Sequence, residues 1–223
     1  MNKHLILLVA ACLSLASCAT SKFYSQNAQD LRPMVLVQPY SFITDAVGDL
    51  STNYIEEASR FNQETISELT SSIMPVETVI NLDYGEGSTD ATLGLWMHHL
   101  QGVKPGEAQD LIIPAALRNL VRESGYRYGL VLADLGYVKN AKQLIVEKAV
   151  GTGIALLEIF THSNIYVGTD SGSPYENGVF SIIFDSQTGK VVWFGKYPKA
   201  KAFNPLDPSS VGKQLKKLYK DFR

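Results

Sequence analysis

The first half of the chain alternates between short apolar runs and one long amphipathic pattern. Apolar runs at 34–40 and 76–82 are too short for helices and predict buried strands. Residues 53–73 instead predict a helix, with Asn53 as its cap and Glu56 completing a capping box. The helical spacing of three and four residues predicts that its buried stripe consists of Ile55, Ala58, Phe61, Thr65, Leu69 and Ile73.

The middle of the chain predicts further helices and one long strand. Helices are expected over 90–100 and 114–124, each followed by a glycine that favours termination. The apolar run 126–138 predicts a strand, and 140–150 predicts another helix. The periodicity of 151–160 leaves helix and strand equally open.

A hairpin and a helix complete the pattern. Two apolar runs flank "DSQTG" (185–189), a turn in which Gly189 takes the position that requires a positive φ. Asp207 is expected to cap a final helix that Pro208 opens. Its predicted inner face is Val211, Leu215, Leu218 and Phe222, and its predicted outer face carries Lys213, Lys216, Lys217 and Lys220.

This order of elements predicts a fold of the α/β or α+β class, in which helices pack on one mixed sheet. The length of 223 residues and a hydrophobic content of 45% are sufficient for one core, and we expect a single domain over 34–223. The formal net charge of −2 gives no indication of a nucleic-acid partner.

The N-terminus has the layout of a secretory signal. A short basic start precedes an apolar run over 5–15 that is too short to span a bilayer, which needs about 20 residues. The next residues, "LASC", resemble the lipobox of bacterial lipoproteins, in which the cysteine becomes the lipid-modified N-terminus. That resemblance implies a signal peptide over 1–17, lipidation of Cys18, and a polar tether over 18–33.

The lipobox resemblance also implies a location. Ala19 follows the cysteine where an aspartate would retain a proteobacterial lipoprotein in the inner membrane. The following residues lack the acidic cluster of surface-exported Bacteroidetes lipoproteins. We therefore expect a lipid-anchored protein of the outer membrane that faces the periplasm. The other cysteine, Cys12, lies within the signal peptide, so the mature chain would have no disulfide.

Chemical motifs are sparse. "DSGSP" around Ser171 resembles the nucleophile loop of chymotrypsin-like proteases, and His162 is the histidine that could approach it. The same residue types are those that a solvent-facing turn prefers, so a serine hydrolase is the alternative and a simple loop the main interpretation.

No cofactor or metal site is expected. His98 and His99 are adjacent on a predicted helix and point about 100° apart, so they cannot easily chelate one ion, and we expect one partly buried and one exposed. A second alternative function is glycan or small-ligand binding, for which Tyr166, Tyr175 and Trp193 are the candidate aromatics.

The later half of the chain resembles a known group of envelope proteins. "ESGYRYGLVLADLGY", then "SIIFDSQTGKVVWFGK", then an amphipathic helix is similar to lipoproteins with an anticodon-binding-domain-like fold. This group includes the TolB N-terminal domain, the curli secretion lipoprotein and the penicillin-binding-protein activators. The resemblance implies binding to other envelope proteins, in envelope assembly or secretion, and no catalytic residues.

Overall fold

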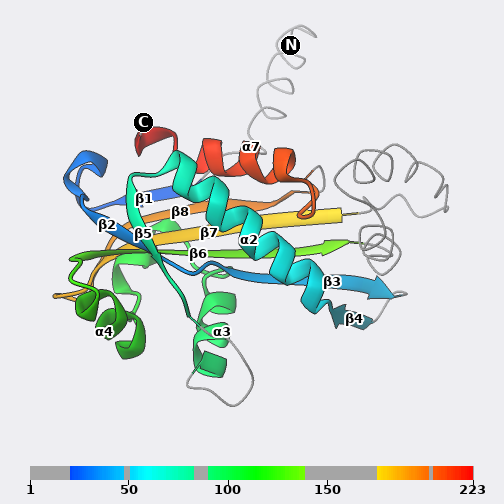
Figure 1. Ribbon diagram of the computed structural model, residues 1–223, viewed down its shortest axis with the longest axis horizontal. Coiled ribbons are helices and arrows are strands. Elements are labelled where there is room, and N and C mark those ends of the chain that lie inside the picture. Colours follow the sequence, from blue (N-terminus) through cyan, green and yellow to red (C-terminus); the bar gives the residue numbers. More distant parts are fainter. Residues whose placement is uncertain (1–20, 48–50, 83–89, 139–174, 201–202, 223) are drawn as a thin grey trace, which may run out of the picture.

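A computed structural model describes residues 21–47, 51–82, 90–138, 175–200 and 203–222. The described residues form one eight-stranded sheet with helices on both faces (Figure 1). The strands are β1 (Ser21–Tyr24), β2 (Met34–Val37), β3 (Tyr40–Val47), β4 (Ser51–Tyr54), β5 (Val76–Ile80), β6 (Tyr128–Val138), β7 (Tyr175–Asp185) and β8 (Val191–Ala200). The helices are α2 (Glu56–Ile73), α3 (Asp90–His99), α4 (Ala115–Glu123) and α7 (Pro208–Leu218), with 3₁₀ turns η1 (Ala28–Asp30), η2 (Pro105–Asp110) and η4 (Lys220–Phe222).

The sheet is mixed, with the order β1-β8-β7-β6-β2-β5. Strand β6 lies within the sheet, between β7 on one side and β2 and β3 on the other, and is therefore buried on both faces along most of its length. Strands β2 and β3 run parallel to successive halves of β6, and β7 runs antiparallel to it. Beyond these, β5 is parallel to β2 and β4 is antiparallel to β3. The predicted fold of the α+β class, a mixed sheet with helices packed on it, is confirmed.

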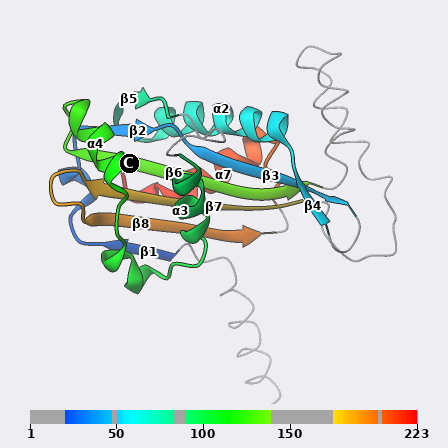
Figure 2. The ribbon, with the colours of Figure 1, turned by 90° about the horizontal axis from the view of Figure 1, so that it is seen from below.

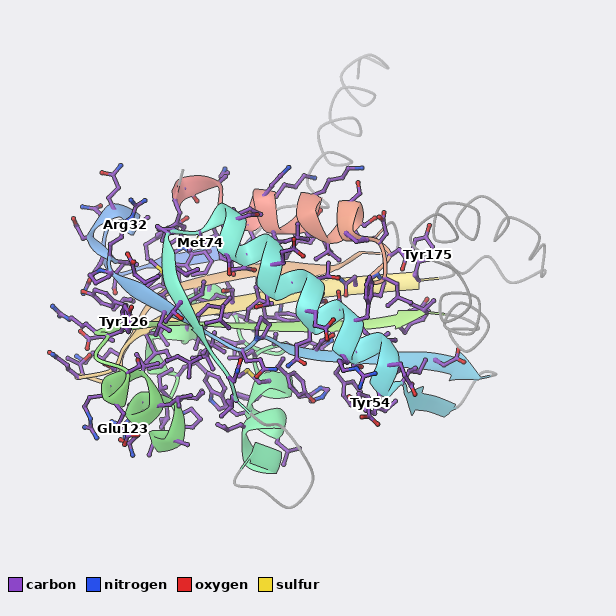
Figure 3. All side chains as sticks on the ribbon, in the orientation of Figure 1. Arg32, Tyr54, Met74, Glu123, Tyr126 and Tyr175 are labelled. Atoms are coloured by element: carbon purple, nitrogen blue, oxygen red, sulfur yellow. The ribbon has the colours of Figure 1, made fainter. Side chains whose placement is uncertain are left out.

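The two faces of the sheet carry different helices and separate cores. Helices α2 and α7 lie side by side over one face, and α3, α4 and η2 cover the other (Figures 1 and 2). Alternate residues of β6 divide between the two cores: Leu130 and Leu132 face α2 and α7, whereas Val131 and Ala133 face α3 and α4. Side chains fill both interfaces along the sheet, from Tyr126 at one end to Tyr175 at the other (Figure 3).

The hairpin and the C-terminal helix agree with the sequence pattern. Gly189 has a φ of +69° in the turn between β7 and β8. The Asp207 carboxylate accepts hydrogen bonds from the backbone N–H groups of Ser209 and Ser210, so it caps α7 as predicted. The four residues of the predicted inner face of α7 and η4 are all buried.

The N-terminal limits of the domain differ from the prediction. Residues 18–33 were expected to form a tether outside the domain, but Ser21–Tyr24 form β1, which pairs antiparallel with β8. Leu31 is fully buried in the core that α2 and α7 cover. A polar strand of four residues has no recognisable pattern of its own, because its pairing partner lies near the other end of the chain.

Helix α2 begins later than expected, and Asn53 does not cap it. Asn53 lies in β4, opposite Asp45 of β3, and Ile55 precedes the helix without a side-chain cap. The buried residues of α2 are Ala58, Ser59, Asn62, Ile66 and Thr70, so most of the predicted apolar stripe is displaced by one position. The helix turns this partly polar face inward because the sheet beneath it carries polar groups that pair with it.

No helix within the described ranges combines the length and apolar character needed to cross a membrane.

Candidate functional site

A buried carboxylate lies between the sheet and the helices α2 and α7. Asp134 interrupts the apolar sequence of β6 and is 0% exposed. Its Oδ2 accepts hydrogen bonds from Nδ2 of Asn62 at 3.0 Å and from Nδ2 of Asn177 at 3.1 Å. The three side chains come from α2, β6 and β7, so this contact joins a helix to the two central strands.

The same polar cluster extends to β3 and α7. Asn62 Nδ2 also donates to Ser41 Oγ at 3.0 Å, and Asn177 Nδ2 donates to Gln214 Oε1 at 2.9 Å. Gln214 Nε2 donates in turn to the backbone oxygen of Asn177 at 3.2 Å. We call Ser41, Asn62, Asp134, Asn177 and Gln214 the buried polar cluster. Because each residue belongs to a different element, the cluster fixes how both helices sit on the sheet.

The cluster contains more acceptors than donors. Oδ1 of Asp134 and the Oδ1 atoms of Asn62 and Asn177 are buried without a hydrogen-bond partner among the described residues. No ion pair of the described residues includes Asp134. Burial raises the pKa of Asp134 to about 7, although the bonds from Asn62 and Asn177 oppose the shift. A protonated Asp134 would supply a donor where acceptors are in excess.

A groove on the opposite face of the sheet is lined by several apolar side chains. It lies between α3 and η2, has a volume of about 480 Å³, and is lined by Trp96, His99, Gly102, Val103, Glu107, Asp110, Leu111 and Ile112. The Trp96 indole N–H donates to the Ile112 carbonyl at 3.1 Å and so connects its two sides. Ile112 is 85% exposed, and Leu95, the neighbour of Trp96 on α3, is 72% exposed. We call this feature the α3–η2 groove.

The paired histidines have separate environments. The His98 ring packs edge-on against Phe42, with centroids 4.6 Å apart, and its Nε2 lies 3.1 Å from the Tyr40 hydroxyl. His99 is exposed and lines the α3–η2 groove. One histidine is thus partly buried and the other exposed, as predicted. Over the part of the chain that the structure describes, no group of three His, Cys, Asp or Glu residues could hold a metal ion.

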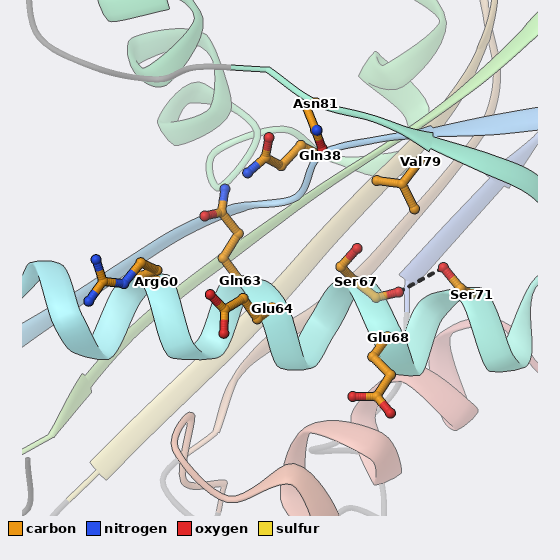
Figure 4. Close-up of a pocket in the computed structure, with 9 residues that line it drawn as sticks. All are labelled: Gln38, Arg60, Gln63, Glu64, Ser67, Glu68, Ser71, Val79 and Asn81. Carbon is orange, nitrogen blue, oxygen red and sulfur yellow. Dashed lines mark hydrogen bonds between the residues drawn. The ribbon is translucent and has the colours of Figure 1, made fainter. Parts of the chain in front are cut away.

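A second groove lies between α2 and β5 (Figure 4). Its volume is about 570 Å³, and every residue that lines it except Val79 is polar or charged. Several lining groups are engaged within the chain: Gln63 Nε2 donates to the Pro39 oxygen at 2.7 Å, and Gln38 Oε1 accepts from the Leu82 N–H at 2.8 Å. This groove is therefore a polar seam between two elements, and its charged residues come from α2 alone.

The structure tests only part of the predicted site. Cys18, Tyr166, His162 and Ser171 lie outside the described residues, so the lipidation site and the alternative serine hydrolase remain predictions. Tyr175 is half-buried at the start of β7.

Trp193 corrects one expectation of the glycan-binding alternative. It is 0% exposed, and its ring contacts those of Tyr219 and Phe222 with centroids 5.6 and 5.3 Å apart. A sugar cannot reach this ring, because it lies beneath α7 and η4. Trp193 is therefore a core residue.

The sequence analysis did not identify the members of the buried polar cluster. Asp134 gave one signal, a carboxylate in an otherwise apolar run of β6. Asn62, Asn177 and Gln214 gave none, because polar residues on amphipathic helices and at strand ends are ordinary. Their burial depends on contacts between elements that are far apart in sequence.

Comparison with known proteins gives similarities of structure only. No protein-family model and no curated protein sequence matches the chain. A PelC dodecamer from Paraburkholderia phytofirmans is similar over 92% of this chain and 98% of its own, with 9% sequence identity and a TM-score of 0.43. A DUF4136 family protein from Bacteroides thetaiotaomicron is similar over 88% of this chain and 93% of its own, with 10% identity and a TM-score of 0.30.

Proposed function

We propose that this protein is a lipid-anchored envelope protein that faces the periplasm and acts by binding another envelope protein through the α3–η2 groove. The observation that carries the proposal is the 85% exposure of Ile112 in the lining of that groove, where Trp96, Val103 and Leu111 also lie. Apolar side chains gathered at a hollow are typical of protein-binding surfaces. The resemblance to lipoproteins that act by protein contacts supports the same function.

The border of the groove suggests the chemistry of the partner. Glu107 and Asp110 line it and are exposed; Glu107 pairs with Lys104 at 3.9 Å, and no ion pair of the described residues includes Asp110. The carboxylate of Asp110 beside an apolar centre favours a partner with an apolar side chain next to a basic one. The Trp96 indole, held by its bond to the Ile112 carbonyl, gives the groove a rigid aromatic wall.

Photocrosslinking in intact cells tests the groove. With a photoreactive analogue in place of Ile112, we expect one reproducible protein adduct from the envelope, because this side chain is 85% exposed at the groove. The matched control carries the analogue in place of Glu123, which is exposed at the end of α4 away from the groove. With the analogue kept at Ile112, Trp96→Ala should weaken recovery of the same partner, because Trp96 lines the groove. Equal adducts at both positions, or none at Ile112, would contradict the proposal.

The anchor has a separate test. Cells fed an alkyne analogue of palmitate should label the wild-type protein, and Cys18→Ser should abolish the label, because the lipid would be attached through that thiol. Labelling that persists in Cys18→Ser would reject the assignment of this residue.

A further inference from the structure

The exposed face of α7 consists of lysines. Between Val211 and Tyr219 the exposed residues are Lys213, Lys216 and Lys217, and every other residue in this range is buried. Lys220, at the start of η4, is also exposed. None of these four lysines forms an ion pair with another described residue. We call them the α7 lysine face.

The α7 lysine face lies beside the first strand of the domain. Ser21 of β1 is in register with Lys196 of β8, and the next residue, Tyr197, lies under the Lys217 ammonium at 5.8 Å from the ring centroid. Asp221, next to Lys220, binds Lys22. The chain therefore enters the domain close to the C-terminal part of the lysine face.

The distance from the proposed lipid is short. Ser21 follows Cys18 by three residues, which span at most about 11 Å when fully extended. A membrane that holds Cys18 must therefore come close to the start of β1. Lysines within that distance lie in the electrostatic field of anionic headgroups, which reaches about 8 Å at physiological salt.

The distribution of charge indicates which side of the sheet can contact an anionic membrane. On one side of β1 lies η2, whose exposed residues include Glu107 and Asp110. Helix α2 is also acidic, with Glu56, Glu57, Glu64 and Glu68 exposed against one arginine, Arg60. Only the α7 lysine face offers a concentrated positive charge among the described elements around β1.

We propose that the α7 lysine face lies on the anionic phosphate headgroups of the membrane that holds the N-terminal lipid. This inference rests on the proposed function for the position of the anchor. It adds an orientation: α7 and α3 are on opposite faces of the sheet (Figures 1 and 2), and α3 residues line the α3–η2 groove, so a membrane under α7 leaves the groove open to the periplasm.

A site-specific fluorescent label can measure this orientation. With Cys12 removed and Cys18 acylated, the mature protein would contain no other cysteine, so one engineered thiol would be labelled uniquely. Ser209→Cys places the label on the exposed start of α7, and Glu123→Cys places it on α4, across the sheet. The lipidated protein is reconstituted in phosphatidylcholine vesicles with and without phosphatidylglycerol, with a quencher attached to the headgroups.

We expect the α7 label to be quenched several-fold more than the α4 label in the anionic vesicles. The difference should disappear in pure phosphatidylcholine and at high salt. Lys213→Glu with Lys217→Glu should remove it, and Lys213→Gln with Lys217→Gln should reduce it without placing negative charge at a helix C-terminus. The control, Arg122→Glu with Lys190→Glu, changes the net charge equally at positions outside the face and should retain the difference. Circular dichroism confirms that each variant is folded.

The outcomes separate this inference from the proposed function. Equal quenching of both labels on anchored protein overturns the inference and leaves the anchor intact. Protein that carries no lipid contradicts the proposed anchor. The same unlipidated chain should then still bind anionic vesicles, and Lys213→Gln with Lys217→Gln should weaken this binding roughly 25-fold, at about fivefold for each lysine. The inference is overturned if the unlipidated chain shows no preference for anionic vesicles. It is also overturned if crosslinking from the α7 lysine face in cells gives adducts with an acidic protein instead of lipid.

Discussion

Asp134→Asn should stabilise the protein by about 4 kcal/mol at pH 8 and change its stability little near pH 4. The folded state raises the pKa of Asp134 from 3.8 to about 7, a shift of about three pH units, each worth about 1.36 kcal/mol. The unfolded chain loses this proton near pH 4, whereas the folded chain keeps it until about pH 7. The free energy of unfolding of the wild type therefore falls as pH rises across that window, relative to the variant.

The new amide would also improve hydrogen bonding. An asparagine side chain can still accept from Asn62 or Asn177, and its N–H groups supply donors to the unpaired oxygens of the buried polar cluster. Urea unfolding at a series of pH values measures the effect as the difference between variant and wild type. A difference that does not change between pH 4 and pH 8 would show that Asp134 is not a buried titrating group.

Asp185→Asn is the matched control for this series. The Asp185 carboxylate accepts from the backbone N–H of Thr188 and from Arg127, and these bonds lower its pKa although burial alone would raise it. Its contribution to stability is therefore present above the unfolded pKa and is lost as pH falls through the lower, folded value. The control should be less stable than the wild type at neutral pH, opposite in sign to Asp134→Asn.

Trp193→Ala should destabilise the fold by about 3–5 kcal/mol, the range found for truncation of a large buried aromatic side chain. The Trp193 ring is fully buried and packs against Tyr219 and Phe222 beneath the C-terminal end of α7. Neighbouring Gly195 makes room for it, since a Cβ there would lie 2.4 Å from the ring. Its removal would leave a cavity between α7 and β8 that these side chains cannot fill.

The second tryptophan provides the comparison. Trp96 is half-buried at the α3–η2 groove, so Trp96→Ala should reduce stability by less than half as much and act chiefly on partner binding. Urea unfolding of both variants measures the contrast. Equal losses, or a negligible loss for Trp193→Ala, would contradict the packing of β8 under α7 described here.

The elements that were predicted correctly are those whose signals are local. Asp207 and Pro208 begin α7, and Asp185 to Gly189 make a turn, through contacts within a few residues. Strands β1 and β4 were missed because each has only four residues and no clear alternation of apolar and polar positions. The pairing of β1 also cannot be inferred from neighbouring residues, since its partner β8 lies near the other end of the chain.

The predicted inward face of α2 was partly wrong for a related reason. Ile55 and Ala58 are buried as predicted, but farther along the helix Asn62 and Thr70 are buried where the apolar spacing predicted Phe61 and Leu69. The bond from Asn62 to Asp134 joins residues 72 positions apart, so its presence cannot be inferred from the periodicity of either segment. The α3–η2 groove was also unpredicted, since it depends on Ile112 being exposed between two helices.

The pairing of β1 with β8 has a consequence for the order of folding. Ser21 meets Lys196, so the two strands are separated by most of the chain. During synthesis, β1 has no partner until β8 has been made, and the sheet must stay open at that edge. The contact order of this edge is high, which slows folding and leaves β7 and then β8 exposed to pairing with other chains. A chain truncated before β8 would lack β8 and would also leave β1 without its partner. We therefore expect such a chain to aggregate more than the loss of one strand alone would suggest.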